Sequence, residues 1–365
     1  MTELPDPRCF AATTANPITS LSERAVNPAD ALQRRAILDE LHAELRGALG
    51  AGRDDLLTPA LAEVVSPAAG RVLWEALDRA INSPGDPHNG LAAQVFAFPL
   101  VLVTGGPASV TVPGTLREPH AIEEVLATEG ALGHVRNFGL NGALCADTSM
   151  EGFSPSQLYA VLRGLESGGT QSWSDLLPAE IDLDSADESV HLRFLTGVAV
   201  TPAQAPSIVE TAADIGRWGM PVSRELIAQL GQPGLSLLAL PRPPNGLLQA
   251  VHAGRRAREE IAYQVFLSSA LRRMRAETGE PEATVAALEG GAIGVRLLAP
   301  ADGQRRAFHR WELDALDDLT SVTESILGLL AECRVRDVRI LPAVVSESDF
   351  SAGESNVAAR YAGPA

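Results

Sequence analysis

The first part of the chain shows the hydrophobic spacing of amphipathic helices separated by short breaks. Apolar positions recur at helical intervals after Asp30, which can cap a helix, until the break at Gly50. The same spacing predicts further helices over 54–65 and 67–81, the second with a proline in its first turn. Residues 1–28 instead carry four prolines and little periodicity, so an irregular N-terminal segment is predicted there.

From residue 93 onward, short β-favouring runs alternate with helical patterns. The apolar run 95–103 is interrupted by Pro99 and is too short for a helix, so it predicts a buried strand that ends at Gly105. Apolar and polar residues alternate over 190–195, as they do in a half-buried strand. The remaining patterns predict strands over 109–112 and 235–240 and helices over 119–128, 154–165, 205–218 and 221–230.

A proline-rich hexamer at 241–246 precedes a long helical pattern over 247–276 and marks a predicted domain boundary. Further patterns predict strands over 293–298, 306–313 and 335–341 and a helix over 316–330. The fold class is therefore α/β or α+β, with a helical N-terminal part and a small C-terminal sheet packed with the long helix. Its predicted parts are an irregular segment 1–28, a mixed α/β domain 29–243, the long helix with a small α+β domain 244–350, and a flexible tail 351–365.

The charge of the chain limits the classes of molecule that it is expected to bind. The chain has 29 basic and 46 acidic residues, a net charge of -17, and this balance opposes attraction to nucleic acid and to anionic membranes. Every basic residue is arginine, so chemistry that needs a lysine amine, such as the P-loop or Schiff-base catalysis, is excluded. A GC-rich bacterial genome explains the absence of lysine most simply. An effector-type protein that escapes ubiquitin-like tagging is the alternative.

The sequence indicates a cytoplasmic protein. Cys9, Cys145 and Cys333 are widely spaced, which suggests neither a disulfide framework nor a zinc site. The N-terminus is acidic and interrupted by prolines, unlike a secretory signal. The longest apolar run is about half of the roughly 20 residues that a membrane-spanning helix needs.

The sequence does not match the common cofactor-binding and metal-binding motifs. The run that ends at Gly105-Gly106 resembles the end of a nucleotide-binding strand, but Pro107 and an extended pattern follow in place of a phosphate-binding helix. The histidines never stand at the i, i+4 spacing that two metal ligands on one helix face require. No cofactor and no metal ion are therefore predicted.

Segment 133–147 has the densest collection of reactive and hydrogen-bonding side chains. His134, Cys145 and Asp147 are its candidate catalytic residues. Arg136, Asn137 and Asn141 are its candidate ligands for a carboxylate or phosphate. The alternative interpretation is structural, with the asparagines in turns, an Arg136–Asp147 ion pair and a buried cysteine.

The long helix carries two arginine clusters, about 27 Å apart along its axis. Four of these arginines are candidates for docking an acidic partner protein: Arg255, Arg256, Arg258 and Arg273. The alternative is a solvated face on which they pair with nearby glutamates. The leading hypothesis is an interaction or regulatory protein without catalytic chemistry of its own, with another protein as partner and a homo-oligomer possible. The alternatives are an enzyme or small-molecule binder that acts on an anionic ligand through 133–147, and a lysine-free effector.

Overall fold

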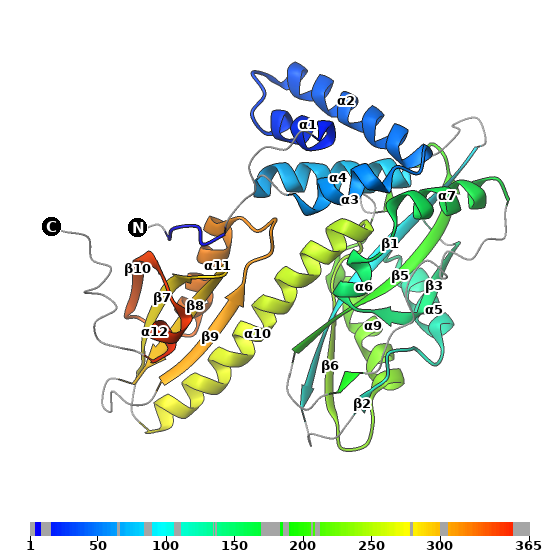
Figure 1. The fold of residues 1–365 in the computed structure, drawn as a ribbon. Helices are drawn as coiled ribbons and strands as arrows, with labels where there is room; N and C mark the ends of the chain where they lie inside the picture. The colour runs from blue at the N-terminus through cyan, green and yellow to red at the C-terminus, as the bar shows by residue number, and fades with distance from the viewer. Residues whose placement is uncertain are drawn as a thin grey trace. The chain divides into compact units, whose positions relative to one another are not determined.

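The computed structural model has a mixed α/β fold, as the sequence predicts (Figure 1). It describes residues 4–8, 16–63, 66–83, 90–105, 111–133, 135, 137–168, 183–184, 190–205, 207–208, 212–277, 280–299 and 306–352. The chain divides into two compact units. The N-terminal unit is Ala12–Arg258, and the C-terminal unit is Glu259–Ala365 together with Met1–Ala11.

The N-terminal unit begins with the packed helices α1 (Pro17–Val26), α2 (Ala31–Gly50), α3 (Asp54–Ala62) and α4 (Pro67–Asn82). The prediction of an irregular segment over 1–28 is wrong for α1. Asn16 starts this helix because its side chain accepts the Ile18 N–H, and a proline occupies the first turn. Buried side chains on one face of α1 then hold it against α2 and α4.

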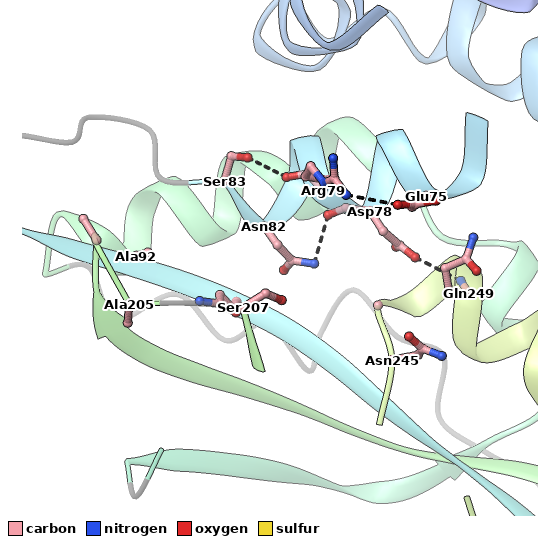
Figure 2. Close-up of a pocket in the computed structure, with 13 residues that line it drawn as sticks. Glu75, Asp78, Arg79, Asn82, Ser83, Ala92, Ala205, Ser207, Asn245 and Gln249 are labelled. Atoms are coloured by element: carbon pink, nitrogen blue, oxygen red, sulfur yellow. Dashed lines mark hydrogen bonds and ion pairs between the residues drawn. The ribbon is translucent and has the colours of Figure 1, made fainter. Parts of the chain in front are cut away.

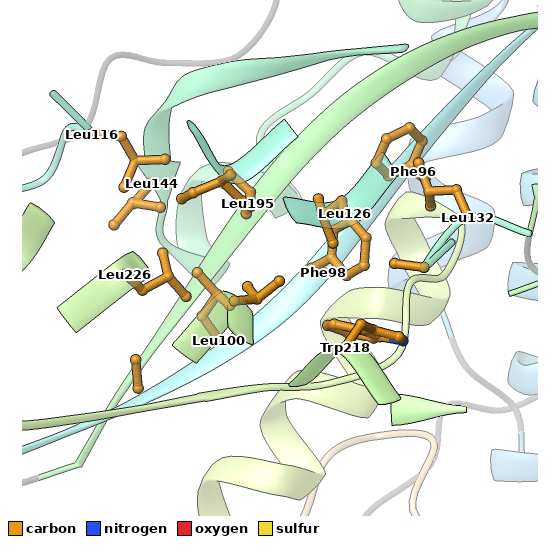
Figure 3. Packing of buried hydrophobic residues seen from close by; sticks show 14 of the residues in the cluster. Phe96, Phe98, Leu100, Leu116, Leu126, Leu132, Leu144, Leu195, Trp218 and Leu226 are labelled. Carbon is orange, nitrogen blue, oxygen red and sulfur yellow. The ribbon is translucent and has the colours of Figure 1, made fainter. Parts of the chain in front are cut away.

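Four antiparallel strands form the sheet of this unit in the order β3-β5-β1-β6. They are β1 (Leu91–Gly105), β3 (Phe138–Cys145), β5 (Val190–Pro202) and β6 (Ser236–Pro241). Alternate side chains of β1 pack against α5 (Pro119–Glu129) and α9 (Ile215–Leu230), where Phe98 meets Trp218 edge to face at 5.3 Å (Figure 3). β1 also contacts α4 and α7 (Pro155–Glu166), which explains its long apolar run. The short strands β2 (Thr111–Val112) and β4 (Leu183–Asp184) pair with each other.

The strand β3 and the helix α9 also differ from the sequence prediction. β3 contains two glycines and an asparagine, which disfavour strands, and no strand is predicted there. Pairing with β5 forms it nevertheless, and a bulge between Leu140 and Leu144 absorbs the irregular residues. α9 is one helix that contains Pro221, instead of two helices, because its buried face with Trp218 and Leu226 packs on the sheet.

Helix α10 (Leu247–Glu277) contains the boundary between the units, which falls after Arg258. The sequence places the boundary earlier, at 243–244, directly before this helix. Gly254 allows a close approach to β5, because a Cβ there would lie 2.9 Å from the Phe194 ring.

The C-terminal unit has a four-stranded sheet in the order β10-β7-β8-β9, with β10 parallel to β7 and the other pairs antiparallel. Its elements are β7 (Glu282–Leu288), β8 (Ala292–Leu298), β9 (Arg306–Glu312), α11 (Leu319–Glu332), β10 (Val338–Val345) and α12 (Glu347–Ala352). One core joins the sheet to α11 and to α10 residues such as Tyr263 and Leu267. A second cluster surrounds the fully buried Phe350 of α12. No strand is predicted at β7, because its alanine-rich sequence carries a weak strand signal.

Candidate ligand-binding site

The structure does not gather the described residues of segment 133–147 into a site. Asn137 is exposed at the start of β3, whereas Cys145 at its end is fully buried. The Asn141 side chain accepts the Ala143 N–H at 3.2 Å within the β3 bulge. His134 and Arg136 lie outside the described residues. The burial of Cys145 separates its thiol from solvent, where a substrate would approach.

Asp147 instead forms ion pairs with the first arginine cluster. It begins the short helix α6 (Asp147–Glu151), and its carboxylate lies 3.3 Å from Arg255 Nε and 4.0 Å from Arg258 Nη1. Glu151 at the end of α6 contacts Arg255 Nη2 at 2.5 Å. One candidate residue of segment 133–147 thus pairs with two candidates of the first arginine cluster inside the N-terminal unit. In the second cluster, Arg273 is exposed and donates to the Ser269 carbonyl oxygen at 3.4 Å.

A cavity of about 360 Å³ elsewhere in the N-terminal unit combines apolar surface with several polar groups, as ligand sites do (Figure 2). Its wall combines α4, the start of β1, the segment after β5 and the residues that begin α10. We call this cavity the Asp78 pocket. Its polar lining comes mainly from one buried carboxyl, several carboxamides and an ion pair between Glu75 and Arg79 at 3.0 Å.

Asp78 lies on α4 and caps the N-terminus of α10. Its two carboxyl oxygens accept the backbone N–H groups of Leu248 at 3.2 Å and Gln249 at 2.9 Å. The side chain is buried, and burial raises its pKa from 3.8 to about 7 although both N–H groups favour the ionised form. Gly246 makes this approach possible, because a Cβ at that position would lie only 2.5 Å from the Asp78 carboxyl carbon.

Two carboxamides of the pocket each make one donor and one acceptor bond within the fold. Asn82 accepts the Val95 N–H at 2.8 Å and donates to the Asp78 carbonyl oxygen at 3.0 Å. Gln94 donates to Thr201 Oγ1 at 3.1 Å and accepts the Ile208 N–H at 3.0 Å. These bonds fix α4, β1 and the segment after β5 around the cavity.

Two other carboxamides at the start of α10 have no such partners. The Asn245 backbone pairs with Ala97 through bonds of 2.9 and 3.0 Å, but its side-chain amide bonds to none of the described residues. Gln249 Nε2 is buried and likewise has no hydrogen-bond partner among the described residues. Both residues belong to the pocket lining, which therefore contains two carboxamides that bond to none of the described residues (Figure 2).

The pocket is not predicted from the sequence, although the sequence contains two local signals of it. Asp78 interrupts the buried face of α4, where its neighbours Leu77 and Ile81 are fully buried. Asn245-Gly246 stands directly before a long helix, a pattern that also suits a domain boundary and is interpreted in that way.

Comparison with known proteins gives no relative: the chain matches no family model, no curated protein and no solved structure. Within the described residues, no cluster of three or more His, Cys, Asp or Glu side chains could hold a metal ion. In the same part of the chain, no helix is both long and apolar enough to cross a membrane.

Proposed function

We propose that the protein works by binding, without catalytic chemistry of its own, and that the Asp78 pocket takes up a small polar molecule. The observation that carries this proposal is the buried Gln249 Nε2 in the pocket wall, which has no partner among the described residues. A regulatory or interaction protein of this kind would respond to the molecule and pass the response to a partner protein. The net charge of -17 supports a protein with no nucleic-acid or membrane partner.

The energetics of Gln249 support a ligand. A buried donor that lacks a partner costs about 1–3 kcal/mol, and folded proteins retain few such groups. Because Nε2 is buried, a bound molecule reaches its N–H groups only if the amide turns, and an oxygen or ring nitrogen of that molecule would then accept them. A bound acceptor would offset the cost of the unpaired donor.

The size and lining of the pocket support a small molecule. Its volume of about 360 Å³ lies near the lower end of the 300–1,000 Å³ range of ligand sites. Carboxamides and the small side chains of Ala92, Ala203 and Ala205 are among the lining groups. Such groups recognise a molecule through hydrogen bonds and shape.

A variant that fills the pocket tests this proposal for any class of ligand. Ala205→Phe places a ring in the cavity, and Ala62→Phe, at an exposed position on α3, is the matched control. Saturation-transfer NMR with uracil, glucose, benzamide, benzoate and benzylamine measures binding to each protein. We expect at least one probe to bind the wild type and the Ala62→Phe variant but not the Ala205→Phe variant. If Ala205→Phe removes the binding of none of these probes, the proposed function is wrong.

A further inference from the structure

We infer that the molecule bound in the Asp78 pocket is uncharged and presents an amide-like edge, in which a carbonyl oxygen or ring nitrogen lies beside an N–H donor. Nucleobases, lactams and carboxamides have this edge. The inference rests on the proposed function, which it makes more specific. Asn245 and Gln249 are the residues that would recognise the edge.

The available hydrogen-bonding groups have the required pattern. A carboxamide presents an acceptor oxygen and donor N–H groups in one plane, so it pairs side by side with another amide-like edge. Asparagine and glutamine use this pairing when they bind the edge of adenine in DNA. In the Asp78 pocket, Asn245 and Gln249 are the carboxamides with no partner among the described residues, whereas Asn82 and Gln94 use their groups within the fold.

The charges of the pocket disfavour both anions and cations. A carboxylate or phosphate would need a cation in the described lining, and the lining residue Arg79 is already paired with Glu75 at 3.0 Å. An ammonium group would need an accessible carboxylate. Both Asp78 oxygens already accept backbone N–H groups, and Glu75 pairs with Arg79 at 3.0 Å. An uncharged molecule needs neither a free cation nor a free carboxylate in the described lining.

The apolar part of the wall suits a flat molecule. Ala92 and Ala205 lie on the pocket wall together with Ala203 (Figure 2). Methyl groups do not project far, so they leave an apolar surface on which a ring can rest while its polar edge meets the carboxamides. The start of β1 and the segment after β5 are paired through Leu91 and Pro202, which keeps these alanines in place.

Three probes with one ring and different head groups test the ligand class. Benzamide has the amide-like edge, benzoate is an anion and benzylamine is a cation. We expect benzamide and uracil to bind the wild-type protein more tightly than the other two, in saturation-transfer titrations at constant ionic strength. Binding of benzoate, benzylamine or glucose alone, when it is abolished by Ala205→Phe, contradicts the inferred class and leaves the proposed function standing.

Gln249→Met tests the recognising residue, because methionine keeps the length of the side chain without its amide. We expect the variant to bind benzamide and uracil about tenfold more weakly, since one well-formed amide pair contributes on the order of 1–3 kcal/mol. Asn245→Ala should weaken binding in the same direction. The control is Gln157→Met, an exposed carboxamide on α7.

The stability of Gln249→Met separates recognition from a structural role. The urea midpoint of the variant should equal or exceed that of the wild type, because the substitution removes a buried donor without a partner. If Gln249→Met lowers the midpoint and leaves benzamide binding unchanged, the side chain supports the fold and the inference is wrong. The same conclusion follows if an ordered water alone occupies the position beside Nε2 and no probe displaces it.

Discussion

The protonation of Asp78 makes the stability of the protein depend on pH in a way that can be worked out in advance. Burial raises the pKa of this carboxyl from 3.8 to about 7. Between about pH 4 and pH 7, the folded state therefore keeps a proton that the unfolded state has released. The stability that this group contributes is fully present below about pH 4 and is lost as the pH rises through 7.

The size of this effect follows from the pKa difference. The change from 3.8 to about 7 spans about three pKa units at about 1.4 kcal/mol each, which gives about 4 kcal/mol. Asp78→Asn removes the titration and keeps the shape of the side chain. In the variant, the amide NH₂ faces one of the two backbone N–H groups. The free-energy cost of placing two donors against each other is the same at every pH. The free energy of unfolding of the variant minus that of the wild type should thus rise by about 4 kcal/mol between pH 4 and pH 8.

Urea denaturation at constant ionic strength measures this difference. Tryptophan fluorescence follows the N-terminal unit through Trp74, which lies on α4 with Asp78. Asp39→Asn, at an exposed position on α2, controls for the loss of one negative charge. If the difference between Asp78→Asn and the wild type stays constant over this pH range, Asp78 does not hold the proton and the reasoning from its burial is refuted.

Three further substitutions test the packing by urea denaturation. Gly254→Ala should destabilise the protein by about 1–3 kcal/mol despite the better helix propensity of alanine, because its Cβ meets Phe194; a stabilised variant would show that α10 and β5 can separate at little cost. Tyr263→Phe should raise stability by about 1 kcal/mol, since the buried hydroxyl has no partner among the described residues, and a clear loss would reveal a missed hydrogen bond. Arg255→Glu should lower stability by about 1 kcal/mol through repulsion from Asp147, whereas an unchanged midpoint would mean that this ion pair contributes nothing.

The sequence determines the elements whose hydrogen bonds are local. Helical spacing and end signals locate α2, α4 and α10 to within a few residues, because a helix bonds residues four apart and buries one continuous stripe. The long apolar run likewise identifies β1, since a strand covered on both faces needs no polar alternation. Composition alone excludes lysine-dependent chemistry.

Tertiary structure decides the elements and contacts that depend on distant residues. β3 exists because β5 pairs with it, although its own residues disfavour a strand. Asp147 pairs with Arg255, which is 108 positions away, and Asp78 caps α10 across 170 positions. The sequence gives the type of each side chain but not the residue that it contacts. Many different pairings of the same residues are compatible with the same local pattern. The pocket forms only where the fold brings α4, β1 and the start of α10 together and leaves Asn245 and Gln249 without protein partners among the described residues.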